Sequence, residues 1–183
     1  MVYVLLAEGF EEVEALTPVD LLRRAGAEVR LIGVTGSIVH GSHGIGVETD
    51  LTMEQVDWDA GEMIVLPGGM PGTTNLYAEG RVTEAVRRYF DEGKYIAAIC
   101  AAPSVILGGM GLLNGRRATC YPGMEEGMKG ALPQRQSCVV DGKIITACGV
   151  GGALDFACAL VAALCGEETA RKIAQAVVYH AAG

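Results

Sequence analysis

The sequence has no long run of positive charge and no long run of apolar residues. Its net charge is −8, its isoelectric point is about 4.9, and lysine and arginine cluster only in pairs such as Arg23-Arg24. This acidic balance argues against a surface for nucleic acids or anionic membranes. No apolar run approaches the roughly 18 residues of a membrane span, and the first residues lack the basic leader of a signal peptide. We therefore expect a cytoplasmic protein with no nucleic-acid or membrane partner.

Metal and nucleotide motifs are also missing. The six cysteines form no Cys-x-x-Cys pair, and the chain has only three histidines. Zinc sites and disulfide frameworks need closely spaced or regularly paired cysteines, so the sequence predicts neither. Neither of the glycine-rich phosphate-binding loops, Gly-x-Gly-x-x-Gly or Gly-x-x-x-x-Gly-Lys-Ser/Thr, occurs, which leaves nucleotide binding without support. No metal site is expected.

The chain is long enough for one well-buried core and short for two. It has 183 residues, of which 50% are hydrophobic, and no stretch resembles a linker, a repeat or a low-complexity segment. These properties predict a single domain over residues 1–183.

Short apolar runs alternate with amphipathic stretches. Continuous apolar runs indicate strands that are buried on both faces, and strands alternating with helices indicate parallel β-α-β units. The predicted strands are 2–6, 29–34, 63–66, 95–99 and 117–120, with a hairpin of 137–140 and 143–147; the predicted helices are 11–25, about 79–92, 151–164 and 167–178. Residues 36–50 are either a hairpin or irregular, and 51–56 stay unassigned. The fold class is an α/β three-layer sandwich with a mostly parallel sheet.

Cys100 stands where a predicted strand meets a predicted helix. The apolar run Tyr95–Ile99 precedes it, and Pro103 suits the first turn of a helix. A nucleophile on such a turn needs small residues two positions away on both sides, and here these are Ala98 and Ala102. The amides of the following helix would favour the thiolate. A reactive cysteine and a small core residue both fit this stretch, and the other five cysteines are interpreted as packing residues.

Glu14 lies on the apolar side of the first predicted helix. Phe10, Val13, Glu14, Thr17 and Leu21 follow helical spacing and share one face. Burial would raise the pKa of the Glu14 carboxyl, so it could donate a proton or a hydrogen bond near neutral pH. The alternative is an acidic first-turn residue that complements the helix dipole.

Gly68 and Gly69 follow the predicted strand 63–66. Their amides could approach a substrate oxygen as an oxyanion hole, or the pair could be a tight turn. In an open parallel sheet, sites form beyond the carboxyl ends of the strands, where this loop, Cys100 and the loop after the first strand would meet. No histidine is close to Cys100 in the sequence, so a Cys-His dyad would need His40, His43 or His180.

Several of these segments resemble one family. The segments are 7–14 (AEGFEEVE), 17–20 with 23–26, 65–69 (VLPGG), 97–103 (AAICAAP) and 149–160. Together they are similar to the DJ-1/PfpI (ThiJ) superfamily, specifically its DJ-1-like branch, over essentially the whole chain. The resemblance implies a flavodoxin-like sandwich, usually a homodimer, with no cofactor.

The resemblance also implies roles for four residues. Cys100 matches the reactive cysteine of the family, and Glu14 matches the protonated glutamate that hydrogen-bonds it. The amides of Gly69 and Ala101 match its oxyanion donors. Both the nucleophile and the buried-carboxyl interpretations are thereby favoured over their alternatives.

Two departures from the family pattern limit what carries over. The protease-like branch has histidine directly after the cysteine, whereas this chain has Ala101, which argues against peptidase activity. The DJ-1 branch often has histidine near the sulfur, where this chain has Tyr121 in Thr119–Pro122. A histidine proton shuttle is therefore in doubt, and we expect the tyrosine hydroxyl to orient a ligand. His43 aligns loosely with a dimer-interface arginine.

Three functions follow from the resemblance. The first is a cofactor-independent enzyme acting on methylglyoxal, glyoxal or their adducts, as a glyoxalase III or a deglycase, with Cys100 as the nucleophile and Glu14 as the acid and base. The second is a redox sensor or chaperone that works through a sulfinic acid at Cys100. A role in thiamine synthesis ranks third, because no phosphate-binding motif is present. The expected partners are a small aldehyde or glycated substrate and a second copy of the chain.

Overall fold

A seven-stranded sheet forms the middle of the molecule. The structure is a computed structural model that describes residues 1–180. The strands of the sheet are β1 (Val2–Leu6), β2 (Val29–Gly33), β5 (Leu51–Thr52), β6 (Met63–Leu66), β7 (Tyr95–Ile99), β10 (Cys138–Asp141) and β11 (Ile144–Ala147). Their order is β10-β11-β7-β6-β1-β2-β5, and in the described chain only β10 and β11 pair antiparallel within this sheet. The predicted mostly parallel sheet is confirmed.

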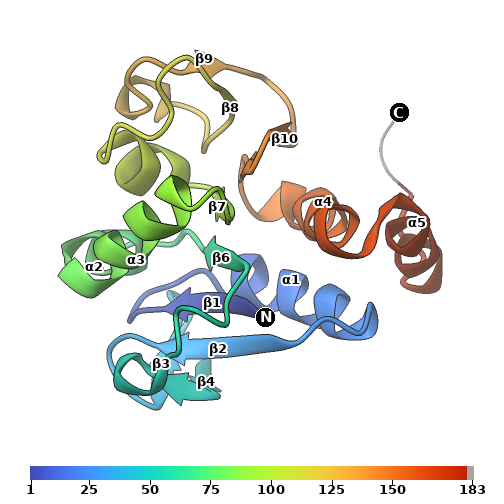
Figure 1. The fold of residues 1–183 in the computed structure, drawn as a ribbon, viewed down its shortest axis with the longest axis horizontal. Helices are drawn as coiled ribbons and strands as arrows, with labels where there is room; N and C mark the ends of the chain where they lie inside the picture. The colour runs from blue at the N-terminus through green and yellow to red at the C-terminus, as the bar shows by residue number, and fades with distance from the viewer. Residues whose placement is uncertain (181–183) are drawn as a thin grey trace.

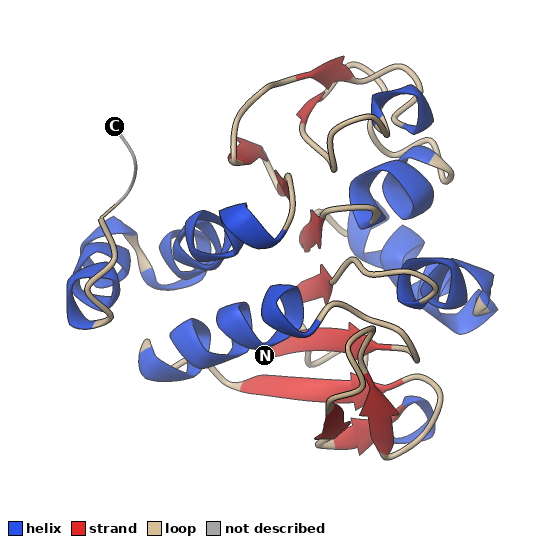
Figure 2. Cartoon of the chain, turned by 180° about the vertical axis from the view of Figure 1, so that it is seen from behind, coloured by secondary structure: helices blue, strands red, loops and turns tan. Residues whose placement is uncertain are grey.

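Helices cover both faces of the sheet (Figures 1 and 2). One face carries α1 (Glu12–Arg24), α4 (Ala153–Cys165) and α5 (Glu167–Ala176); the other carries α2 (Gly72–Ala78), α3 (Gly80–Asp91) and a π-helix, Pro103–Gly108. Side chains alternate between the faces along each strand: Val2 and Val4 of β1 pack with the first group, and Tyr3 and Leu5 with the second. The three-layer sandwich is therefore built as predicted.

Smaller elements lie beside the main layers. Of the two alternatives for residues 36–50, the structure shows the hairpin, which consists of β3 (Ile38–His40) and β4 (Gly46–Glu48). A second small sheet pairs β8 (Arg117–Ala118) in parallel with β9 (Leu132–Pro133). Short 3-10 helices occur at Met53–Gln55, Glu125–Gly127 and Val150–Gly152. No described helix has the length and apolar character needed to cross a bilayer.

Two local predictions differ from the structure. The helix α2 was not predicted, because its seven residues, GTTNLYA, begin with glycine and two threonines, which are weak helix formers. After Pro103 the chain forms a π-helix rather than an ordinary α-helix. Such helices are rare and often occur at functional sites.

Candidate active site

A cleft opens at the carboxyl edge of the sheet. Its volume is about 460 Å³, and it is lined by Glu11, Glu14, Gly69, Cys100, Tyr121, Pro122, Cys148, Gly149, Val150 and Gly151. The loops after β1, β6, β7 and β11 meet here, as expected for a parallel sheet. Of the residues singled out in the sequence, Cys100, Glu14, Gly69 and Tyr121 line the cleft directly.

Cys100 adopts a backbone conformation that is unusual for a residue with a side chain. Its φ is +65°, in the left-handed region, directly after β7. Two hydrogen bonds hold it: its amide donates to the Ala147 carbonyl at 2.9 Å, and its carbonyl accepts from the Tyr121 amide at 2.8 Å. Ala98 and Ala102 on either side are fully buried. The elbow therefore forms where the pattern of small residues predicts it.

Glu14 is buried beside Cys100. Its carboxylate is fully inaccessible to solvent, and its Oε2 accepts a hydrogen bond from the Gly68 amide at 3.0 Å. The other oxygen, Oε1, has no hydrogen-bond partner in the described structure and lies at the same end of the cleft as the Cys100 sulfur. An ideal Cβ on Gly149 would be 3.7 Å from this oxygen and 3.9 Å from the sulfur. Both reactive atoms thus face one point in the cleft.

Burial controls the ionisation of this pair. Loss of solvent raises the pKa of Glu14 to about 7, although contacts with Cys100 and the Gly68 amide act in the opposite direction. Burial is also the main cause that raises the pKa of Cys100, and the negative charge of Glu14 is the second. Hydrogen bonds from the Gly69 and Ala101 amides lower this pKa. The Cys100 shift depends partly on an ionised Glu14, so the two groups titrate as a coupled pair.

The two loop glycines allow the backbone to approach the pair. An ideal Cβ on Gly68 would lie 2.5 Å from both the Glu14 Oε2 and the Cys100 Cβ. Gly69 has φ +87°, and a Cβ there would be 2.4 Å from the Glu11 amide nitrogen. The loop is therefore more than a turn, because it brings the Gly68 amide onto the carboxylate and the Gly69 amide towards the sulfur.

Gly68→Ala is expected to separate the Glu14 carboxylate from Cys100. The added methyl group has no free space, so overpacking should lower the free energy of unfolding by about 1–3 kcal/mol and reduce the reactivity of Cys100. Urea denaturation and the rate of alkylation by iodoacetamide measure the two effects. Gly80→Ala is a suitable control, since no atom lies within 4 Å of its ideal Cβ. Unchanged alkylation in Gly68→Ala would contradict this interpretation of the loop.

Tyr121 forms a wall of the cleft. Its side chain is 52% exposed, and its ring carbon Cδ2 would be 3.5 Å from an ideal Cβ on Gly149. Its backbone amide fixes the Cys100 carbonyl. The segment therefore contributes to the elbow through its backbone and to the cleft through its ring.

The sequence did not reveal several cleft residues. Cys148 and the 149–151 segment become neighbours of Cys100 because β11 lies next to β7, whereas Glu11 comes from the loop after β1 and Pro122 from the segment after β8. Cys148 was interpreted as a packing residue, but the structure places it in the cleft wall. A usable signal existed: Cys148 directly follows a predicted strand, as Cys100 does.

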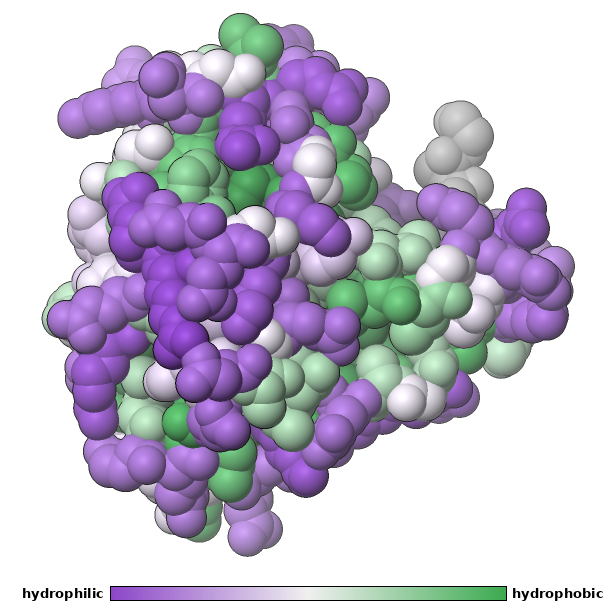
Figure 3. Space-filling model, viewed as in Figure 1, coloured by the Kyte–Doolittle hydropathy of each residue, from purple (hydrophilic) through white to green (hydrophobic). Residues whose placement is uncertain are grey.

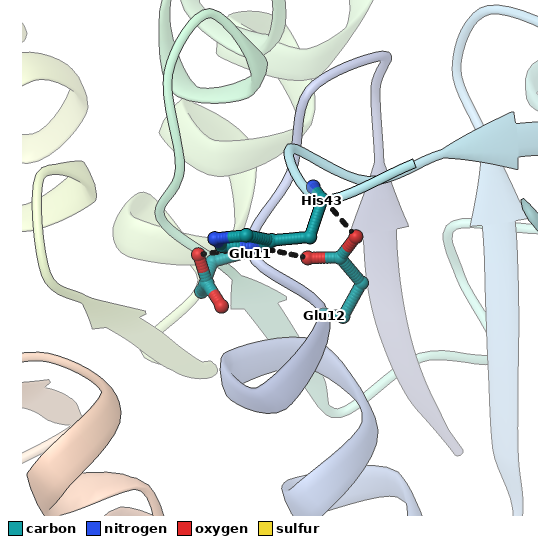
Figure 4. Close-up of side chains that lie close together, drawn as sticks. All are labelled: Glu11, Glu12 and His43. Carbon is teal, nitrogen blue, oxygen red and sulfur yellow. Dashed lines mark hydrogen bonds and ion pairs between the residues drawn. The ribbon is translucent and has the colours of Figure 1, made fainter. Parts of the chain in front are cut away.

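His40 and His43 engage carboxylates rather than Cys100. His43 Nδ1 lies 3.0 Å from Glu12 Oε2 and 3.6 Å from Glu11 Oε2 (Figure 4). Burial raises the pKa of Glu12, but hydrogen bonds from His43 outweigh it and hold the pKa below its usual value; the same contact raises the pKa of His43. His40 contacts Glu8 at 3.6 Å.

The same three residues, Glu11, Glu12 and His43, are the group of possible metal ligands found in the described chain. In this structure His43 Nδ1 pairs with the Glu12 carboxylate at 3.0 Å. The cluster is thus satisfied as an ion pair.

Comparisons with known proteins confirm the resemblance. The model of the DJ-1/PfpI family matches residues 1–163. Protein DJ-1 homolog B of Arabidopsis thaliana is 35% identical over 179 residues, which cover 97% of this chain and 41% of the plant protein. A deglycase of Pyrococcus abyssi is 35% identical over 127 residues, covering 69% of this chain and 75% of that protein.

Solved structures agree with the sequence matches. Oxidized DJ-1 of Toxoplasma gondii has a TM-score of 0.93 and 37% identity, with 97% of each chain covered. The chain spans less than half the length of the two Arabidopsis relatives, 41% and 45%. Over nearly all of its own length, this chain belongs to the DJ-1/PfpI family.

Proposed function

We propose that this protein is a cysteine-dependent, cofactor-independent enzyme that acts on methylglyoxal, glyoxal or their adducts. One observation carries the proposal: a fully buried carboxyl whose pKa is about 7 faces the same point as a cysteine on a left-handed elbow. A carboxyl that titrates near neutral pH can both give and take protons. The match to a protein named as a deglycase supports the same substrate class.

The first step is attack on the aldehyde carbon. The pKa of Glu14 is about 7 and burial raises the pKa of Cys100 to about 12, so the single proton of the pair lies on the sulfur. The Glu14 carboxylate takes this proton as the sulfur attacks, which forms the thiolate. The thiolate forms a C–S bond, and the carbonyl electron pair moves to oxygen. The amides of Gly69 and Ala101 stabilise that oxygen, and Glu14 protonates it to give a hemithioacetal.

For methylglyoxal, the remaining steps need only a base and water. The Glu14 carboxylate removes the proton from the carbon bonded to sulfur, and the neighbouring ketone carbon receives a proton. One carbon is oxidised and the other reduced, so the product is a thioester without an external oxidant. Water then cleaves the C–S bond, which releases lactate and returns the Cys100 thiol. In the deglycase reaction, the Cys100 sulfur bonds to the adduct carbon as the bond to the glycated amine or thiol breaks, and Glu14 passes the thiol proton to that leaving group.

A comparison of two substrate forms, the free aldehyde and its adduct, tests this proposal. Methylglyoxal alone and its preformed adduct with N-acetylcysteine are given to the protein without glutathione, and lactate and free thiol are measured. Lactate from both, with thiol released faster than by spontaneous decay of the adduct, supports a deglycase. If lactate forms from the adduct only as fast as the adduct releases free methylglyoxal, the enzyme carries out the glyoxalase reaction alone.

The alternative function is a redox sensor or chaperone that uses a Cys100 sulfinic acid without turnover. The unpartnered Glu14 Oε1 favours it, since a protonated carboxyl there could donate a hydrogen bond to a sulfinate oxygen. Two oxygen atoms added at Cys100 by mild peroxide, together with no lactate formation, would select this function.

Tyr121→Phe is expected to raise KM for methylglyoxal by less than about tenfold, with little change in kcat. Its side chain is half exposed, and removing one hydroxyl costs about 0.5–1.5 kcal/mol. Steady-state kinetics of lactate formation checks the split. A loss in kcat larger than a hundredfold would instead make the hydroxyl a proton donor in the reaction.

We also propose a cytoplasmic homodimer. Apolar side chains gather on the face over α1 and α4 (Figure 3), where Val13 and Leu154 are exposed. Burying such a patch against a second copy is favourable. Light scattering of wild type and Val13→Glu measures the expected loss of the dimer.

A further inference from the structure

A second cysteine lies at the level of Cys100 in the sheet. Ala147 of β11 pairs with Ile99 of β7, and the Cys100 amide donates to the Ala147 carbonyl at 2.9 Å. The residues that follow the paired positions are Cys100 and Cys148. Neighbouring strands lie about 4.8 Å apart, and a disulfide needs its two Cα atoms about 4.4–6.8 Å apart. The backbone therefore places the two cysteines at neighbouring positions, directly after two adjacent strands.

Both cysteines open onto the same space. They line the 460 Å³ cleft together, and both are half-buried. The residue after Cys148 is Gly149, whose ideal Cβ position lies 3.9 Å from the Cys100 sulfur. Since glycine carries no side chain, no side chain at position 149 lies between the Cys148 segment and the Cys100 sulfur.

Cys148 has a second open side. It also lines a neighbouring cavity of about 500 Å³, together with Pro122 and Arg135. Pro122 and Cys148 belong to both hollows, so they form the shared wall. A dithiol can therefore approach Cys148 from a side that the substrate cleft does not occupy.

The other cysteines lack this placement. Cys120 is buried and its thiol donates to the Tyr121 carbonyl at 3.4 Å, while Cys138, Cys158 and Cys165 pack against the core on the α4 side. Among the described residues that line the cleft, Cys100 and Cys148 are the only thiols.

We propose that Cys148 is the resolving cysteine of a hydroperoxide-reducing activity centred on Cys100. The Cys100 sulfur attacks the terminal peroxide oxygen and the O–O bond breaks. The thiol proton passes through Glu14 to the departing oxygen, so the products are a sulfenic acid and an alcohol or water. The Cys148 sulfur then attacks the Cys100 sulfur; its proton leaves with the hydroxyl as water, and an S–S bond forms. A soluble dithiol reduces that bond by two thiol–disulfide exchanges and is itself oxidised to a disulfide.

The disulfide competes with overoxidation. A sulfenic acid at Cys100 either meets a second peroxide and becomes a sulfinic acid, or meets the neighbouring Cys148 thiol first. The neighbour is always present, so disulfide formation should dominate at low peroxide. This activity does not require aldehyde turnover, and it is tested by measuring the oxidation products of the cysteines alone.

Peptide mass spectrometry after limited peroxide tests the proposal. The reduced protein is treated with one equivalent of hydrogen peroxide, blocked with iodoacetamide and digested with trypsin. Cys100 has a tryptic peptide to itself, residues 95–116, while Cys148 shares residues 144–171 with Cys158 and Cys165. The expected product is a link between these two peptides, two hydrogen atoms lighter than their sum, assigned to Cys148 by fragmentation and removed by dithiothreitol.

Two variants make the result specific. In Cys148→Ser the link should disappear and sulfinic acid should accumulate at Cys100 at the same peroxide dose. Cys158→Ser is the matched control in the same peptide, and its link should persist. The proposal is overturned if wild type and Cys148→Ser give equal amounts of Cys100 sulfinate, or if the link survives in Cys148→Ser. The wild-type measurement stands even if a variant folds poorly.

Discussion

Cys100→Ser is expected to lower the turnover of methylglyoxal by at least about a thousandfold. A serine hydroxyl at neutral pH is far less ionised than a thiol, and in this cleft no histidine is placed to activate it. The rate of methylglyoxal loss, measured with excess substrate, reports the effect. The substitution replaces sulfur by oxygen on the same elbow, so thermal unfolding should change little.

Cys138→Ser serves as the control, because Cys138 lies outside the cleft. Turnover in Cys100→Ser within tenfold of wild type would mean that another group attacks the aldehyde.

Glu14→Gln is expected to raise the free energy of unfolding by about 3 kcal/mol near pH 8 while lowering turnover by about 10²–10⁴-fold. The stability gain follows from the pKa of about 7 in the folded protein against 4.5 for an ordinary glutamate. Between these values the folded state holds a proton that the unfolded state has lost, so wild-type stability falls as pH rises from about 4.5 to 7. Above that range the full cost of a buried carboxylate is present, and glutamine removes it.

Urea denaturation at several pH values measures this difference. The two proteins should have nearly equal stability near pH 4 and diverge as pH rises through about 7. Glu12→Gln is the matched control on the same helix, and its expected effect on the free energy of unfolding has the opposite sign. The pKa of Glu12 lies below its usual value because of His43, so its stabilising charge is lost only when pH falls through that lowered pKa. Glu12→Gln should therefore destabilise the protein at neutral pH. A Glu14→Gln effect that is independent of pH would show that the carboxyl does not titrate where we place it.

Much of the fold follows from local patterns. The strands β1, β6 and β7 occupy the predicted residues, since an uninterrupted apolar run has one favourable place in a parallel sheet. Glu14 is a candidate because a carboxylate interrupts the apolar face of a predicted helix, but only the family resemblance favoured this interpretation over a first-turn charge. Cys100 is a candidate because its flanking alanines are the residues that an elbow needs, and the family resemblance then favoured the reactive cysteine over a core residue.

Other parts of the site depend on which strands become neighbours. Cys148 reaches the cleft through the pairing of β11 with β7, which no local pattern of residues specifies. Gly68 is needed because a side chain at this position would collide with Glu14 and Cys100, and only the folded structure shows that these residues lie so close. The oxyanion roles of Gly69 and Ala101 came from the family resemblance and stay predictions, although both amides act on the sulfur.

The number of lactate molecules formed per protein tests the central claim most directly. Purified wild type is incubated with methylglyoxal in large excess, without glutathione, and lactate is followed with time. The account predicts saturable formation of many equivalents of lactate per Cys100, with the thiol recovered at the end. Consumption of methylglyoxal that stops at one equivalent and leaves Cys100 blocked, with no lactate, would contradict it.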